Sequence, residues 1–250
     1  MTGKTELLFY LSQAAKFTIF FITSYVGGIL VSRAALKANY TRKINHFMIF
    51  FLPLFLDDLF PYEKTLTTTF LGFLLLLLSL SLYTEKMRQR CSVLQTSFLS
   101  FDRPEDRPYT LFWCSTQIAV SSIVLIILIY CLAAIQRLDL IYIPVIISGV
   151  GDGLAEPVGV RFGRHMFATR ALFSTRRYTR SFEGSACVLL TSLATIIYFR
   201  SSFTVNQFWT ALFLFPVLMT LTEAKAPHTW DQPFLYMVAG ILLLTILHLC

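Results

Sequence analysis

The sequence predicts an all-α, polytopic membrane protein with about eight transmembrane helices and both termini on the non-cytoplasmic side. Of its 250 residues, 56% are hydrophobic and only 14% are charged, whereas a soluble domain carries about 25% charged residues. The mean hydropathy is +0.65. These values exclude a disordered protein, a coiled coil and an ordinary soluble enzyme. Since the segments outside the spans are too short to fold alone, we expect a single integral membrane domain over residues 1–250.

Stretches free of Asp, Glu, Lys and Arg supply the predicted helices. They lie between Lys16 and Arg33, Lys43 and Asp57, Lys64 and Glu85, Arg107 and Arg137, Asp139 and Asp152, Glu183 and Arg200, Arg200 and Glu223, and after Asp231. Several reach the length of about 20 residues that crosses a hydrocarbon core. The second (46–60) and the fifth (140–158) span it only if their charged or Gly-rich ends enter the membrane. The first has no small-residue cleavage site, so it is predicted as a span rather than a signal peptide.

Basic residues are distributed unevenly between alternate loops. With the loops assigned to two sides, 16 Lys and Arg residues fall on one side and 5 on the other. Because Lys and Arg are enriched in cytoplasmic loops, the loops after the first, third, fifth and seventh spans are predicted to be cytoplasmic. The net charge of +7 is therefore attributed to membrane topology, and no nucleic-acid partner is expected.

The predicted cytoplasmic loop over residues 151–185 holds two carboxylates at the edge of a span. Asp152 and Glu156 stand four residues apart, on one helical face near the inner end of the fifth span. A carboxylate inside a membrane helix costs about 2.5–3.5 kcal/mol on insertion scales, so it usually faces a polar cavity. Two stacked carboxylates suit Mg²⁺, which prefers hard oxygen ligands and is often completed by substrate phosphates. In the alternative, the span ends at Val150 and both acids lie in water.

Glycines and arginines fill the rest of this loop. Gly151, Gly159 and Gly163 allow a backbone to approach a phosphate, but the G-x-x-x-G spacing serves close helix packing equally well. The arginines, with no acidic residue among them, are Arg161, Arg164, Arg170, Arg176, Arg177 and Arg180. Arginine matches phosphate oxygens bidentately, although such a loop also fixes topology or binds anionic headgroups. Beside the two carboxylates, the pattern indicates a polyphosphate with its metal.

Two further cytoplasmic clusters contribute candidates. Lys43 and His46 open the second span, where His46 is either a base or a capping or interface residue. Asp231 precedes Gln232 and Pro233 between the last two spans, and is either a metal ligand or a helix cap.

These residues carry a resemblance to a known family. The motifs read R-K-I-N-H over residues 42–46, G-D-G-L-A-E-P-V-G-V-R-F-G over 151–163 and R-S-F-E-G-S over 180–185. Their order resembles the CTP-dependent polyprenol kinases, which include the dolichol, phytol and farnesol kinases and are distantly similar to phosphatidate cytidylyltransferase. Glu223 and the Asp231-Gln232-Pro233 run look like a loose version of a later family motif. The chain departs from the family at Arg180, which is usually Lys, and at Gln232, which is usually Asn.

The resemblance implies a membrane-embedded kinase that transfers a phosphoryl group from CTP to an isoprenoid alcohol dissolved in the bilayer, with Mg²⁺ as cofactor. Asp152 would be the essential carboxylate, acting through the metal. The predicted catalytic residues are Asp152, Glu156, His46 and Lys43, and the metal ligands are Asp152, Glu156 and Asp231. The predicted nucleotide-binding residues are Gly151, Gly159, Gly163, Arg164, Arg176, Arg177, Arg180, Ser181, Glu183, Gly184 and Ser185.

Other functions remain open alternatives. The same fold would serve CMP transfer to a lipid phosphate, phosphorylation of diacylglycerol, or a non-catalytic lipid-binding subunit. A transporter is disfavoured, because only one span is interrupted by glycines and inverted repeats would place a counterpart in the first half. No retention or transit signal distinguishes the endoplasmic reticulum, the plastid and the bacterial inner membrane.

Overall fold

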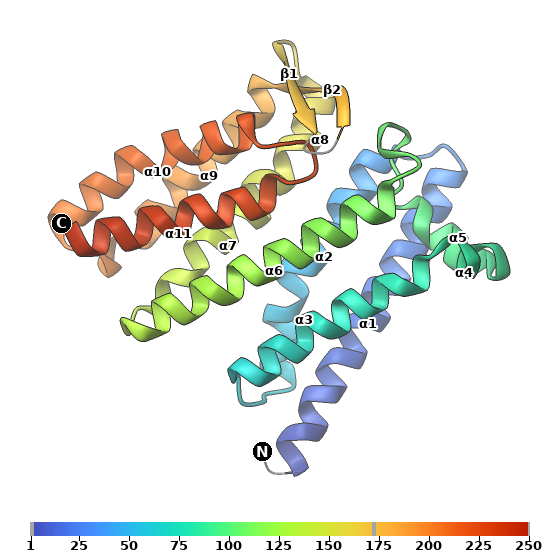
Figure 1. The fold of residues 1–250 in the computed structure, drawn as a ribbon, viewed down its shortest axis with the longest axis horizontal. Helices are drawn as coiled ribbons and strands as arrows, with labels where there is room; N and C mark the ends of the chain where they lie inside the picture. Colours follow the sequence, from blue (N-terminus) through green and yellow to red (C-terminus); the bar gives the residue numbers. More distant parts are fainter. Residues whose placement is uncertain (1–2, 172–173, 250) are drawn as a thin grey trace. The chain divides into compact units, whose positions relative to one another are not determined.

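The helices expected from the apolar stretches are present in the computed structural model, which describes residues 3–171 and 174–249 (Figure 1). The protein is 82% helical, which confirms the all-α class. The chain divides into two compact units, one running up to Ile118 and the other from Ala119 onward. Each unit is described by itself.

Six helical segments in the described part of the chain are long and apolar enough to cross a membrane. They are α1 (Gly3–Ser32), α3 (Leu66–Leu80) with the 3₁₀ turn Ser81–Tyr83, α6 (Thr110–Ala134), the segment Leu138–Phe162, α10 (Val205–Lys225) and α11 (Asp231–Leu249). This supports an integral, polytopic membrane protein. The predicted number of eight spans and the predicted sides of the termini stay predictions.

The two remaining predicted spans form helices that fall short of these criteria. Helix α2 (Ala38–Leu59) has 22 residues, but basic residues near its start and Asp57 and Asp58 at its end leave only a short apolar stretch between them. Helix α9 (Phe182–Tyr198) is apolar but has only 17 residues.

In the first unit, α1 packs against α2 and against α5 (Ser92–Leu99), which follows the short helix α4 (Glu85–Arg90). The predicted loop between the third and fourth spans is therefore partly helical. Gly28 decides how closely α1 and α5 approach, because a Cβ atom at this position would lie 1.7 Å from the carbonyl oxygen of Thr96. Only a residue without a side chain fits at this contact.

A buried polar network joins the start of α2 to α1 and α5. Thr41 Oγ1 donates to the Ser100 carbonyl at 2.6 Å, and Asn45 Nδ2 donates to Ser100 Oγ at 2.7 Å. Ser24 Oγ in turn donates to Asn45 Oδ1 at 3.1 Å. Since buried polar groups are costly unless paired, this network fixes the register between the three helices.

The fifth predicted span lies in the second unit and extends beyond the predicted residues 140–158 at both ends. It consists of a 3₁₀ turn (Leu138–Ile141), α7 (Tyr142–Ile146), a π-helix (Ile147–Asp152) and α8 (Gly153–Phe162). The helical backbone continues to Phe162 and the Asp152 side chain is buried, which argues against the alternative in which the span ends at Val150 and both acids lie in water. Short π-helical turns occur frequently at functional sites.

The predicted loop over residues 151–185 contains regular secondary structure in its described residues. After α8 the chain forms an antiparallel hairpin of β1 (Met166–Ala171) and β2 (Ser174–Ser181), and α9 follows directly. Met166 pairs with Ser181 and Arg170 pairs with Arg177. The Thr and aromatic residues of this segment favour extended backbone. The sequence prediction considered only the charge of its arginines and therefore did not include the strands.

The core of the second unit is formed by α9, α10 and α11 with the π-helix. Val188, Ile196, Phe215, Met219 and Leu243 are fully buried there. Helix α10 begins with a capping box in which Thr204 and Gln207 satisfy each other's backbone N–H groups. This packing places the start of α9, the end of α10 and the start of α11 next to Asp152 and the hairpin.

Candidate functional site

Arg180, at the end of β2, is the centre of a buried charged cluster. Its Nη1 lies 2.5 Å from Glu223 Oε1 and also donates to the Glu223 backbone carbonyl, while its Nη2 lies 3.5 Å from Asp231 Oδ2. Glu223 comes from the end of α10 and Asp231 from the start of α11. All three side chains are nearly buried, so one guanidinium joins β2 to the end of α10 and the start of α11, which lie more than 40 residues further along the chain.

The carboxylates around Arg180 keep it charged. Burial alone would lower the pKa of the guanidinium, but the nearby carboxylates of Asp231, Glu223 and Asp152 together raise that pKa above its ordinary value. Asp152 therefore lies within electrostatic reach of Arg180. The structure brings together four of the motif segments within the second unit: the π-helix, the end of β2, the end of α10 and the start of α11.

Hydrogen bonds extend this cluster in two directions. Ser185 Oγ donates to Glu223 Oε2 at 2.7 Å. On α11, Gln232 Nε2 donates to the Tyr236 hydroxyl at 3.4 Å, and Ser148 of the π-helix is a neighbour of that hydroxyl. Sequence reasoning missed Ser148 and Tyr236; their only signal was that Tyr236 stands one helical turn after Gln232. Gln232 stands where the resembling family usually has Asn, and in this chain its side-chain amide donates a hydrogen bond to Tyr236.

The glycines of the motifs serve close packing of α8. A Cβ atom at Gly184 would lie 2.6 Å from the Ala155 carbonyl oxygen, and one at Gly159 would lie 2.9 Å from Ser181 Oγ. A Cβ at Gly163 would lie 2.9 Å from Ser181 Cβ, and one at Gly151 would lie 3.2 Å from the Cα of Val188. These contacts favour the packing alternative for the glycines, which hold α8 and the π-helix against the start of α9.

Ser181 and Glu183 stabilise the junction between the hairpin and α9. Ser181 is the N-cap of α9, and its Oγ accepts a hydrogen bond of 3.0 Å from the Gly184 N–H. Glu183 Oε1 lies 2.8 Å from Nδ1 of His165, which directly precedes β1 at the same open end of the hairpin. This hydrogen bond, together with backbone hydrogen bonds at the same junction, lowers the pKa of Glu183 to about 2.

The remaining arginines of the hairpin differ in exposure. Arg164 and Arg177 are exposed to solvent. Arg170 is also exposed, and its carbonyl accepts a hydrogen bond of 2.9 Å from the His228 N–H. The ring of His228 stacks on Tyr178 with a centroid distance of 3.6 Å, so the hairpin rests on the loop before α11. Arg176 lies on β2, but its side chain is outside the described residues.

The predicted residues of the first unit occupy the start of α2. Lys43 is buried, and Arg42 Nη1 lies 3.9 Å from Asp106 Oδ2. His46 is half-buried, and its ring lies 4.6 Å from that of Phe50. The expectation that Lys43 and His46 act together with Asp152 stays a prediction.

The carboxylates fit a magnesium ion only in part. Among residues 3–171 and 174–249, no three His, Cys, Asp or Glu side chains gather as a group that would hold a metal. Asp231 is a partner of Arg180, which leaves its predicted role as a ligand a prediction. Asp152, at the end of the π-helix, and Glu156, in the first turn of α8, have the chemistry for such a site, because one or two carboxylates usually hold Mg²⁺ while substrate phosphates complete its shell.

Comparison of the chain with protein-family models, with curated proteins and with solved structures finds no match. The sequence motifs and the geometry of the Arg180 cluster are therefore the features of the protein that indicate a function.

Proposed function

We propose that the protein is a membrane-embedded kinase that transfers the γ-phosphoryl group of CTP to the hydroxyl of an isoprenoid alcohol. The observation that supports this proposal is the buried cluster in which Arg180 joins Glu223 and Asp231 within electrostatic reach of Asp152. Segments that are far apart in sequence contribute to it, and they are the segments that carry the family resemblance.

The surroundings of the cluster suit a reaction between a water-soluble and a membrane-dissolved substrate. The charged groups lie at the ends of apolar helices, beside a hairpin that exposes Arg164 and Arg177. Phosphoryl transfer requires mainly alignment of the reactants and neutralisation of phosphate oxygens. The exposed arginines would bind the phosphates of the nucleotide, because their guanidinium groups match phosphate geometry.

Arg180 would have a different role from that of the exposed arginines. Two carboxylates already hold its guanidinium, and its side chain is only 11% exposed. Arg180 would therefore act as a positioning residue that fixes Glu223 and Asp231 and sets the electrostatic potential at Asp152.

Asp152 and Glu156 would hold Mg²⁺, which when bound neutralises phosphate charge. The roles predicted from the sequence for Lys43, as a phosphate contact, and for His46, as the base that accepts the proton of the alcohol, stay part of the proposal. We also propose that the loops carrying these residues face the cytoplasm, in agreement with the charge distribution of the sequence.

The proposal is tested by labelling lipids with CTP that carries the label on either the γ- or the α-phosphate. Purified protein in nanodiscs receives Mg²⁺ and a mixture of phytol, farnesol, dolichol and diacylglycerol. The expected product is an isoprenoid monophosphate labelled only from γ-CTP. Asp152→Asn should lower this rate at least about 100-fold, since the lost carboxylate acts on the transferred charge. Asp139→Asn is the matched control, because Asp139 lies at the other end of the same helical segment, half-exposed beside Arg137, and should leave the rate unchanged.

Other results would assign other functions. Label from α-CTP would indicate cytidylyl transfer, and labelled phosphatidate would indicate a diacylglycerol kinase. An absence of label from both nucleotides would contradict the kinase and favour a lipid-binding subunit.

A further inference from the structure

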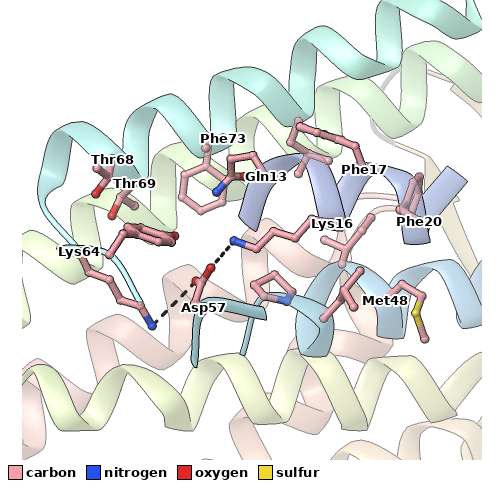
Figure 2. Close-up of a pocket in the computed structure, with 16 residues that line it drawn as sticks. Gln13, Lys16, Phe17, Phe20, Met48, Asp57, Lys64, Thr68, Thr69 and Phe73 are labelled. Atoms are coloured by element: carbon pink, nitrogen blue, oxygen red, sulfur yellow. Dashed lines mark hydrogen bonds and ion pairs between the residues drawn. The ribbon is translucent and has the colours of Figure 1, made fainter. Parts of the chain in front are cut away.

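A second polar site lies in the first unit, at the opposite end of α2 from Lys43 and His46. It is a pocket of about 250 Å³ between α1, α2, α3 and the link before α3 (Figure 2). Neither the family resemblance nor the proposed reaction uses any of its residues.

The lining of the pocket changes from charged to apolar along its length. Lys16, Asp57 and Lys64 gather at one end of the pocket. Lys16 lies near the middle of α1, Asp57 lies in the last turn of α2, and Lys64 lies just before α3. Further along the same helices the lining becomes apolar, with Phe17, Leu52 and Phe73. All three helices therefore change in the same direction, which matches a ligand with a polar head and one apolar chain.

The carboxylate of Asp57 is already surrounded by donors from the protein. Ser12 Oγ donates to Asp57 Oδ1 at 2.8 Å, and Lys16 Nζ lies 2.5 Å from the same oxygen. Lys64 Nζ lies 3.9 Å from Oδ2, so the two lysines approach Asp57 from opposite sides, as Figure 2 shows. The Tyr62 phenol is a further neighbour of this carboxylate. Because these donors already surround Asp57, a ligand that donates hydrogen bonds would find few acceptor positions on this carboxylate.

The donors at this end of the pocket remain able to bind more. Burial and the neighbouring Asp57 raise the pKa of the Tyr62 phenol, so it stays protonated and is a hydrogen-bond donor. The Lys64 side chain is 55% exposed and makes only a long contact with Asp57, while an ammonium group has three protons to donate. Lys16, Lys64 and Asp57 together carry a net charge of +1. The head group that complements them is an anion that accepts hydrogen bonds.

We propose that this pocket binds a single-chain acidic amphiphile, with its carboxylate or phosphate at Lys64 and Lys16 and its chain between Phe17, Leu52 and Phe73. A fatty acid and an isoprenyl monophosphate share this chemistry. The site stands on the geometry of the first unit alone and does not depend on the proposed kinase activity.

Gly72 on α3 offers a way to close the pocket. A Cβ atom there would lie 3.8 Å from Gln13 Oε1, which is an ordinary contact. Gly72→Ala should therefore be accommodated, whereas the side chain of Gly72→Leu extends into the pocket. Lys64→Gln is the second variant, and because Lys64 is exposed it removes the charge without disturbing the fold.

The experiment measures equilibrium binding of labelled oleate, farnesyl monophosphate and farnesol to the full chain in zwitterionic nanodiscs without CTP. Saturable binding of at least one acid is expected, tighter than that of farnesol. Gly72→Leu should weaken it at least about tenfold, and Gly72→Ala less than about twofold. Lys64→Gln should weaken binding of the acid about tenfold and leave farnesol unchanged. Tighter binding of oleate would identify the ligand as a fatty acid, and tighter binding of farnesyl monophosphate would identify it as an isoprenyl monophosphate.

The proposal is overturned if no acid binds saturably, or if Lys64→Gln leaves acid binding unchanged. It is also overturned if folded Gly72→Leu binds like wild type, which would indicate annular lipid only. Circular dichroism and thermal unfolding report whether Gly72→Leu is folded; if it is not, Lys64→Gln decides. Asp152 does not line the pocket, so Asp152→Asn should bind the acid like wild type. A negative result in the kinase assay would therefore not count against the pocket.

Discussion

Arg180 and Glu223 form a buried ion pair, with Nη1 of the arginine 2.5 Å from Oε1 of the carboxylate. They are distant in sequence, on a β-strand and at the end of a helix. Removal of one member of a buried pair leaves an uncompensated charge, which costs more than the pair itself contributes. This asymmetry makes the pair a sensitive test of the second unit.

Arg180→Met is expected to destabilise the protein by about 3–5 kcal/mol, because Glu223 and Asp231 lose the guanidinium between them. Thermal unfolding in detergent measures the loss. The double variant Arg180→Met, Glu223→Leu should lose less stability than the sum of the two single variants, since it removes both charges. Strictly additive losses would argue against the pair.

Gly28→Ala is expected to destabilise the first unit by about 1–3 kcal/mol or more, because the added methyl group forces α1 away from α5. The Cβ atom would lie 1.7 Å from a backbone oxygen, which has no flexible side chain to move aside. Gly72→Ala is the matched control within the same unit. Equal melting temperatures for the two variants would show that α1 and α5 are not in close contact.

Under the proposed kinase function, Arg177→Gln is expected to raise the KM for CTP about three- to tenfold with little change in kcat, because an exposed arginine would contribute binding that is equal in ground and transition states. Steady-state kinetics at low and high salt measure this, and the difference should shrink as salt rises. Arg200→Gln, which removes an exposed arginine from the link between α9 and α10, should leave KM unchanged. A fall in kcat alone would place Arg177 in the chemical step.

Glu183 provides a prediction on pH, and it lies outside the six candidate spans. Its hydrogen bond with His165 lowers its pKa to about 2 in the folded state, below its value in the unfolded chain. The carboxylate therefore stabilises the fold above the unfolded pKa of about 4.3, and this contribution is lost as pH falls toward 2.

Melting temperatures of the wild type and Glu183→Gln, compared from pH 6 to pH 2, test this. The wild type should be the more stable at pH 6, and the difference should disappear toward pH 2. A difference that stays constant through this range would contradict the assigned hydrogen bond.

Much of the helical architecture was predictable because it depends on composition. A stretch such as residues 110–134 has no charged side chains, and in a membrane a backbone without water must bond to itself. The prediction was less accurate where charge and hydrophobicity compete. Helix α2 has polar residues at both ends, and the segment 166–181 combines arginines with strand-forming residues, so its hairpin was read as a loop.

The candidate site was predictable as a set of segments but not as a set of contacts. The motif spacing indicated Asp152, Arg180 and Asp231 as related residues. It did not indicate that Arg180 binds Glu223 and Asp231, nor that Glu183 binds His165 instead of contributing to the same cluster. Such pairings depend on the direction in which each side chain leaves its helix or strand, and sequence distance carries no information on this.

The sequence by itself determined that this chain is a helical membrane protein with a basic, glycine-rich segment near Asp152, because hydrophobicity and charge act residue by residue. Only the tertiary structure decided which carboxylates hold Arg180, why Gly28 and Gly184 must be glycine, and that Lys16, Asp57 and Lys64 meet at the head of an apolar pocket. Those features arise where separate helices pack, so they depend on distances between residues that are far apart along the chain.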